Sequence, residues 1–115
     1  MRLRFALPTC LALLASLPLQ AAPEVKTLGF DDMSCSAWAA GKPDPDTRAQ
    51  QLAWVRGFLS GHNYARQTQQ TSEVSQGTVE TFITRYCNEK ARSTYVEAAQ
   101  RMSDQYSGRN APITK

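Results

Sequence analysis

The 115-residue sequence has a single histidine, three cysteines and six glycines that are never neighbours. One histidine without a cysteine cluster leaves too few ligands for the usual zinc sites. Scattered glycines exclude a glycine-rich phosphate-binding loop, and no nucleophile-elbow motif surrounds a serine. We therefore expect neither an enzyme nor a cofactor, and we interpret His62 as a partly buried helix residue. A catalytic pair of His62 with a distant serine is the alternative.

The chain also lacks an apolar run long enough to span a membrane. Arg2 and Arg4 precede an uncharged segment from Phe5 to Leu19, and its roughly 15 residues fall short of the ~20 that a spanning helix needs. A basic start before a short apolar run is typical of a signal peptide. We expect residues 1–21 to be removed by cleavage after Ala21, with a retained membrane anchor as the alternative.

The mature chain has little excess charge of either sign. Loss of Arg2 and Arg4 reduces the 13 lysines and arginines to 11, against 10 aspartates and glutamates, for a net charge of +1. Such a charge gives no general attraction to nucleic acid or to anionic lipid. We expect no nucleic-acid partner and no membrane anchor.

Two cysteines remain after cleavage, Cys35 and Cys87, separated by 52 residues. Neither has a second cysteine or a histidine within ligand spacing, which argues against a metal site. An oxidising compartment favours their pairing over free thiols. We predict a disulfide between Cys35 and Cys87, for which loop-closure entropy suggests about 4 kcal/mol of stabilisation.

Helical periodicity dominates the mature chain, and no strand-like alternation is long enough to build a sheet. Capping residues and turns separate segments whose apolar residues recur at three- and four-residue spacing. The predicted helix starts use Asp31, Asp32 and Ser34, then Asp46 or Thr47 after a turn at residues 42–46, and a capping box of Thr94 with Glu97. On the second helix the predicted apolar face is made by Leu52, Val55, Leu59 and His62 beside Trp54, Phe58 and Ala65. Residues 67–77 are polar and predict the longest loop, and residues 109–115 predict a mobile tail. We therefore predict an all-α, four-helix domain over residues 22–115, with helices at about 32–40, 47–66, 78–90 and 94–107.

The second predicted helix contains Gly57 and Gly61, four residues apart. In a soluble bundle such a pair usually means close helix packing, so we predict that both glycines face another helix. The mature chain is also rich in aromatic residues for so small a core. These residues either fill the core or form a surface for a partner or a second copy of the chain: Trp38, Trp54, Phe58, Tyr64, Tyr86, Tyr95 and Tyr106.

Three segments together carry a resemblance to a known family: Ser34-Cys35, the run WVRGFLSGHN from Trp54 to Asn63, and Phe82-Ile83 leading to Tyr86-Cys87-Asn88. Over residues 33–106 the chain resembles the periplasmic Rap/Tai-type immunity proteins, which protect bacteria against peptidoglycan-cleaving effectors of type VI secretion. The resemblance implies a periplasmic binding protein that inhibits a secreted cell-wall hydrolase. The residues that match the motif are Trp54, Gly57, Phe58, Leu59, Gly61, Asn63 and Tyr86.

The same layout is similar to the acid-stress chaperones of the HdeA and HdeB type. Both groups often have a proline near the turn before the last helix, where this chain has Glu89-Lys90-Ala91. The match is imperfect at that turn. The shared layout makes an acid-stress chaperone the alternative function, and an accessory envelope protein of the same fold is a third. A homodimer is left open under each of them.

Overall fold

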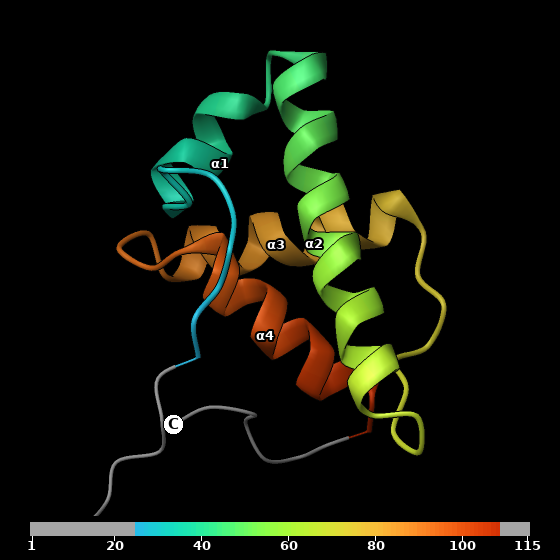
Figure 1. Cartoon of the computed structure of the whole chain (residues 1–115). Coiled ribbons are helices and arrows are strands. Elements are labelled where there is room, and N and C mark those ends of the chain that lie inside the picture. The colour runs from blue at the N-terminus through green and yellow to red at the C-terminus, as the bar shows by residue number, and fades with distance from the viewer. Residues whose placement is uncertain (1–24, 109–115) are drawn as a thin grey trace, which may run out of the picture.

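The computed structural model describes residues 25–108, which form four helices (Figure 1): α1 (Cys35–Gly41), α2 (Pro45–Ala65), α3 (Gln76–Glu89) and α4 (Tyr95–Tyr106). Within this range the only strand-like pairing is one bridge between Ser34 and Thr94. The predicted all-α, four-helix fold is confirmed. The expected signal peptide, residues 1–21, and the tail, residues 109–115, lie outside the described residues.

Helix α1 begins later than residue 32, where we predicted its start. The Ser34 side chain caps the helix by accepting a hydrogen bond from the Ala37 backbone N–H at 3.0 Å. Asp32, which we expected to help start the helix, instead accepts from the Ser34 N–H in the preceding turn. The helix ends at the buried Gly41, where a Cβ would collide with the Gln51 amide. Alanine there would have to displace the Gln51 side chain, which hydrogen-bonds Arg48 and the Ala37 carbonyl.

Helix α2 begins earlier than predicted, because its cap is Asp44 rather than Asp46 or Thr47. The Asp44 carboxylate accepts hydrogen bonds from the backbone N–H groups of Asp46 and Thr47 and from the Thr47 hydroxyl. Pro45 occupies the first helical position, where its missing N–H costs nothing and its fixed φ suits a helix. Residues that we interpreted as a turn therefore form the first turn of α2.

The last two helices also depend on hydroxyl caps. Ser75 accepts from the Thr78 N–H and starts α3 two residues before the predicted residue 78. Thr94 accepts from the Glu97 N–H, as the predicted capping box requires. The Glu97 carboxylate, however, accepts from the Ser93 hydroxyl. Gly108 follows α4 with a φ of 73°, a left-handed conformation suited to glycine at a helix end.

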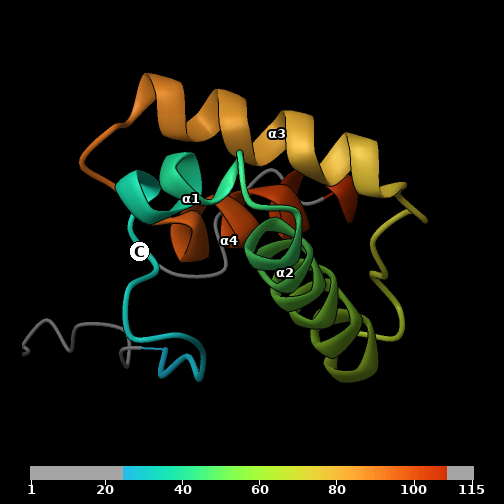
Figure 2. The same cartoon turned by 90° about the horizontal axis from the view of Figure 1, so that it is seen from above.

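Helix α3 packs against the other three helices, and α2 also contacts α1 and α4. Figure 2 shows α3 along one side of the molecule, with the lead-in segment (residues 25–33) on the side away from it. The shared core consists mainly of Trp38, Val55, Val79, Ile83, Tyr95 and Met102. On α2, the predicted inner residues Leu52, Val55, Leu59 and His62 are buried, whereas Ala65 is exposed.

The disulfide joins the start of α1 to α3. Cys35 and Cys87 are bonded, with their Cα atoms 5.2 Å apart. The Cys35 N–H also donates to the Ser93 carbonyl, and the Tyr95 N–H donates to the Met33 carbonyl. The predicted disulfide is confirmed, and the backbone at and just before Cys35 is hydrogen-bonded to Ser93 and to Tyr95, the first residue of α4.

Candidate functional site

The segment Trp54–Asn63 has two faces in the structure. Leu59 is buried in the core, whereas Trp54 and Phe58 are half-buried and stack with their ring centroids 5.7 Å apart. The Trp54 indole N–H donates to the Leu28 carbonyl at 2.7 Å, which ties the lead-in to α2. Both aromatic side chains therefore pack against the core and keep a smaller part of their area at the surface.

The polar end of the segment holds the loop that follows α2. His62 Nε2 lies 2.8 Å from the Gln69 carbonyl oxygen. Since a carbonyl only accepts, Nε2 must carry the proton. The Asn63 side-chain oxygen accepts from both the backbone N–H and the hydroxyl of Thr71, at 2.7 and 3.1 Å. These bonds give His62 and Asn63 structural partners in the loop.

Tyr86, the remaining motif residue, lies where α3 meets α4. Its hydroxyl is 3.3 Å from the Ser93 hydroxyl and donates to the Glu97 carboxylate at 3.4 Å. The side chain is half-buried and packs against the core. It thus joins the end of α3 to the start of α4.

The prediction that Gly57 and Gly61 face another helix is wrong. Both residues are exposed, and a Cβ built on either meets no atom within 4 Å. The reason is angular, because an α-helix turns about 100° per residue. Gly57 is therefore roughly 200° around the helix from Val55, which is fully buried.

Alanine at either exposed glycine should stabilise the protein. Glycine in a helix interior is about 0.5–1 kcal/mol less favourable than alanine, and there is room for the added methyl group. We expect Gly57→Ala and Gly61→Ala each to raise the free energy of unfolding by about that amount, measured by urea denaturation. Gly41→Ala is the matched control and should lower it, since Gln51 occupies the space. A lower denaturation midpoint for Gly57→Ala would contradict the exposed placement.

The exposed face of α2 is almost uncharged. Ten residues between Thr47 and Ala65 are exposed, and Arg56 is the only charged one. Tyr64 is 84% exposed, and Leu28, whose carbonyl accepts from Trp54, is 91% exposed. Solvent-facing helix surfaces normally carry charged and polar side chains. We call this region the α2 surface and define it by Leu28, Gln50, Ala53, Trp54, Gly57, Phe58, Gly61 and Tyr64.

The aromatic residues divide between the two roles that we considered. Trp38 and Tyr95 are buried in the core, with ring centroids 5.6 Å apart. Tyr64 is exposed, and four others are half-buried: Trp54, Phe58, Tyr86 and Tyr106. Core filling accounts for only part of the aromatic content, and the α2 surface contains three of the remaining side chains.

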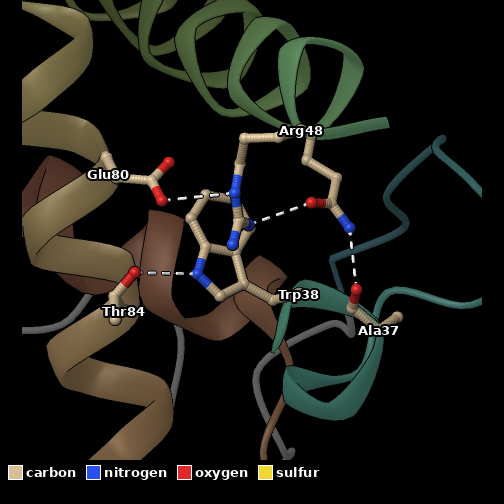
Figure 3. Close-up of polar contacts among 6 residues, drawn as sticks. Ala37, Trp38, Arg48, Glu80 and Thr84 are labelled. Atoms are coloured by element: carbon tan, nitrogen blue, oxygen red, sulfur yellow. Dashed lines mark hydrogen bonds and ion pairs between the residues drawn. The ribbon is translucent and has the colours of Figure 1, made fainter. Parts of the chain in front are cut away.

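Sequence reasoning missed a buried polar cluster around Arg48 (Figure 3). The Arg48 guanidinium lies 3.8 Å from the centroid of the Trp38 ring, and its Nε is 3.2 Å from a Glu80 carboxylate oxygen. Arg48 Nη1 donates to the Gln51 side-chain oxygen, and the Gln51 amide donates to the Ala37 carbonyl. The cluster joins α1, α2 and α3 and is part of the fold.

The charge of Arg48 survives its burial. Its side chain is 9% exposed, and desolvation lowers its pKa, while the Glu80 carboxylate acts in the opposite direction. An arginine starts from so high a pKa that it stays protonated at neutral pH. A sequence signal for this cluster was available, because Arg48 and Gln51 lie on the same helix face as Leu52 and Val55. Its partner Glu80, on another helix, had no such signal.

Residues 25–108 hold no cluster of three or more histidine, cysteine, aspartate or glutamate side chains arranged for a metal ion. In the same range no helix has the length and the hydropathy to cross a membrane. No protein-family model, curated protein or solved structure matches the chain. The class is therefore defined by the fold alone, as a small four-helix domain with one disulfide and an almost uncharged exposed helix face.

Proposed function

We propose that the mature chain is an exported, non-enzymatic binding protein that docks a protein partner on the α2 surface. The observation that carries this proposal is the exposed side of α2 from Thr47 to Ala65, where Arg56 is the only charged residue among ten exposed positions. Exposed apolar patches on soluble proteins are typical of interaction sites. Trp54 and Phe58 also pack against the core, but Gly57, Gly61 and Tyr64 are exposed, so folding does not require these three positions to be uncharged.

The α2 surface has the composition of a protein interface. Interface centres are enriched in tryptophan and tyrosine and depleted in charge. Trp54 and Tyr64 provide aromatic side chains, and Gly57 and Gly61 allow a partner backbone to approach closely. The helix from Gln50 to Tyr64 is about 20 Å long at 1.5 Å per residue. Leu28 extends the surface beyond the helix, toward the ~800 Å² per partner of a standard interface.

Within this class we propose an immunity-type inhibitor of a secreted cell-wall hydrolase. The support is the resemblance of the Trp54–Asn63 segment to the Rap/Tai-type immunity proteins, since the same segment supplies four of the eight residues of the α2 surface. An inhibitor benefits from a preorganised surface, because ordering side chains on binding costs affinity. Trp54 is held by its hydrogen bond to Leu28 and by stacking on Phe58.

Arginine at Gly57 tests the docking surface. Gly57→Arg places a long cation at the centre of the α2 surface where there is open space, so the fold should persist. We expect wild-type protein to bind and inhibit a type VI peptidoglycan hydrolase at pH 7, measured by calorimetry and by cleavage of purified peptidoglycan. The variant should bind about 100-fold more weakly. Thr81→Arg, at an exposed position of α3, is the matched control and should bind normally.

The outcomes separate the competing functions. Equal binding by wild-type protein and Gly57→Arg would remove the α2 surface from the interface. Failure to bind any hydrolase at pH 7, together with suppression of client-protein aggregation at pH 2.5, would identify the acid-stress chaperone instead. Failure in both assays would leave the accessory envelope protein.

A further inference from the structure

A pocket of about 350 Å³ lies between α1, the first turns of α2 and the lead-in. Its wall includes Phe30, Asp32, Asp44 and Gln50, and Tyr95 of α4 also lines it. We call it the α1–α2 pocket. It adjoins the α2 surface, since Gln50 belongs to both. Gln51 and Ala37, which belong to the Arg48 cluster, also line this pocket, so the two features share part of one wall. Figure 2 shows the lead-in on the side of the molecule away from α3.

The Tyr95 hydroxyl is the first sign that the pocket is built for a ligand. Tyr95 is 0% exposed, and in the described residues its hydroxyl has no hydrogen-bond partner. Buried polar groups are nearly always paired, and an unpaired one is costly. Desolvation raises the Tyr95 pKa, and the Asp32 carboxylate raises it further. Tyr95 and Asp32 line the same pocket, so the carboxylate and the phenol ring belong to one wall.

The charge of the pocket is the second sign. Hydrogen bonds from Ser34 lower the pKa of Asp32, and those from Thr47 lower the pKa of Asp44. Both carboxylates are therefore ionised at neutral pH. No lysine or arginine lines the pocket, and the described residues give neither carboxylate an ion-pair partner. The pocket thus combines two unneutralised negative charges with an unpaired hydroxyl and an apolar wall.

We infer that the α1–α2 pocket receives an arginine side chain of the protein partner. The guanidinium would neutralise Asp32 and Asp44 and donate a hydrogen bond to the Tyr95 oxygen, while the aliphatic stem packs beside Phe30. Arginine suits this chemistry better than lysine, because it offers five donors in one plane and is more weakly hydrated. The inference rests on the proposed function, for which it supplies a charged anchor beside the uncharged α2 surface.

A small probe tests the pocket without the partner. N-acetyl-arginine N-methylamide should produce saturable chemical-shift changes at Gly41, Gln50 and Tyr95 in an NMR titration of the oxidised protein. The citrulline analogue has the same shape without the charge and should bind at least 10-fold more weakly. The lysine analogue should fall between them. Binding of the citrulline analogue as tightly as the arginine probe would overturn the inference.

Two variants remove the recognition groups and keep the fold. Tyr95→Phe deletes only the hydroxyl and should weaken the arginine probe about 10-fold, with an unchanged or higher denaturation midpoint. The opposite pattern, an unchanged probe affinity with a lower denaturation midpoint, would indicate a side chain needed only for packing. Asp32→Asn combined with Asp44→Asn removes both charges, while the asparagine oxygens can still accept the Ser34 and Thr47 N–H bonds. This variant should lose saturable binding.

Asp46→Asn is the control, because Asp46 is exposed at the start of α2 and does not line the pocket. Equal weakening by this control would mean nonspecific attraction and would overturn the inference. The two proposals fail separately. Saturable probe binding without any hydrolase binding would retain the pocket and reject the proposed function. Hydrolase binding that depends on Gly57 but comes without probe binding would reject the pocket alone.

Discussion

Replacement of both Cys35 and Cys87 by serine should lower the free energy of unfolding by about 4 kcal/mol. The disulfide closes a 52-residue loop that contains all of α2 and most of α3. Without it, the unfolded chain regains the entropy of that loop, and a domain of this size has only about 5–15 kcal/mol of total stability. Urea denaturation of the oxidised protein and of the double variant, followed by helical circular dichroism, measures the difference.

Dithiothreitol provides the control for this prediction. Reduction should shift the midpoint of the wild-type protein to that of the double-serine variant and leave the variant itself unchanged. Mass spectrometry of unreduced digests should find the Cys35 and Cys87 peptides linked. Free thiols at both positions in protein purified from an oxidising compartment would refute the bridge.

Replacement of Arg48 by methionine should destabilise the protein by about 2–3 kcal/mol, less than the 3–5 kcal/mol typical of breaking a fully buried pair. The expected loss of stability is smaller because the Glu80 side chain is 32% exposed and can recover some hydration. Methionine keeps much of the volume over Trp38 but leaves Glu80 without its cation and Gln51 without its donor. Arg85→Met, at an exposed position on α3, is the control and should change stability by less than about 0.5 kcal/mol.

A double-mutant cycle measures the interaction energy between Arg48 and Glu80. Glu80→Gln alone should cost about 1 kcal/mol, and in the Arg48→Met background it should cost less or become favourable, because it removes an uncompensated charge. Strict additivity of the two effects would show that Arg48 and Glu80 do not interact. Arg48→Lys should restore only part of the stability, since an ammonium cannot bond Glu80 and Gln51 while lying flat on Trp38.

The helix boundaries show where local rules compete. Asp44, Asp46 and Thr47 are all good caps, and the structure uses Asp44 because Pro45 favours the first helical position. Ser75 likewise precedes Thr78, a second hydroxyl that could have started α3, and the two side chains hydrogen-bond each other. Sequence reasoning located each helix but placed these starts two residues late, because several neighbouring residues satisfied the same rule.

The α2 surface shows a different kind of error. Apolar spacing correctly predicted that Leu52, Val55 and Leu59 are buried, and the same angular argument places Gly57 on the opposite side. We treated the glycine pair as a packing motif without applying that angle. Whether the opposite face of α2 was covered could not be decided locally, because it depends on where the other helices lie.

The sequence by itself determined the helical class, the four segments and the choice of cysteines to be paired. These features depend on periodicity and on neighbouring residues, which a linear chain displays directly. The tertiary structure alone decided that Arg48 meets Glu80, that His62 and Asn63 hold the following loop, that one face of α2 stays uncovered and that the Tyr95 hydroxyl lies buried beside an acidic pocket. Such contacts depend on how the helices are oriented and packed against one another, and local sequence patterns do not specify that arrangement.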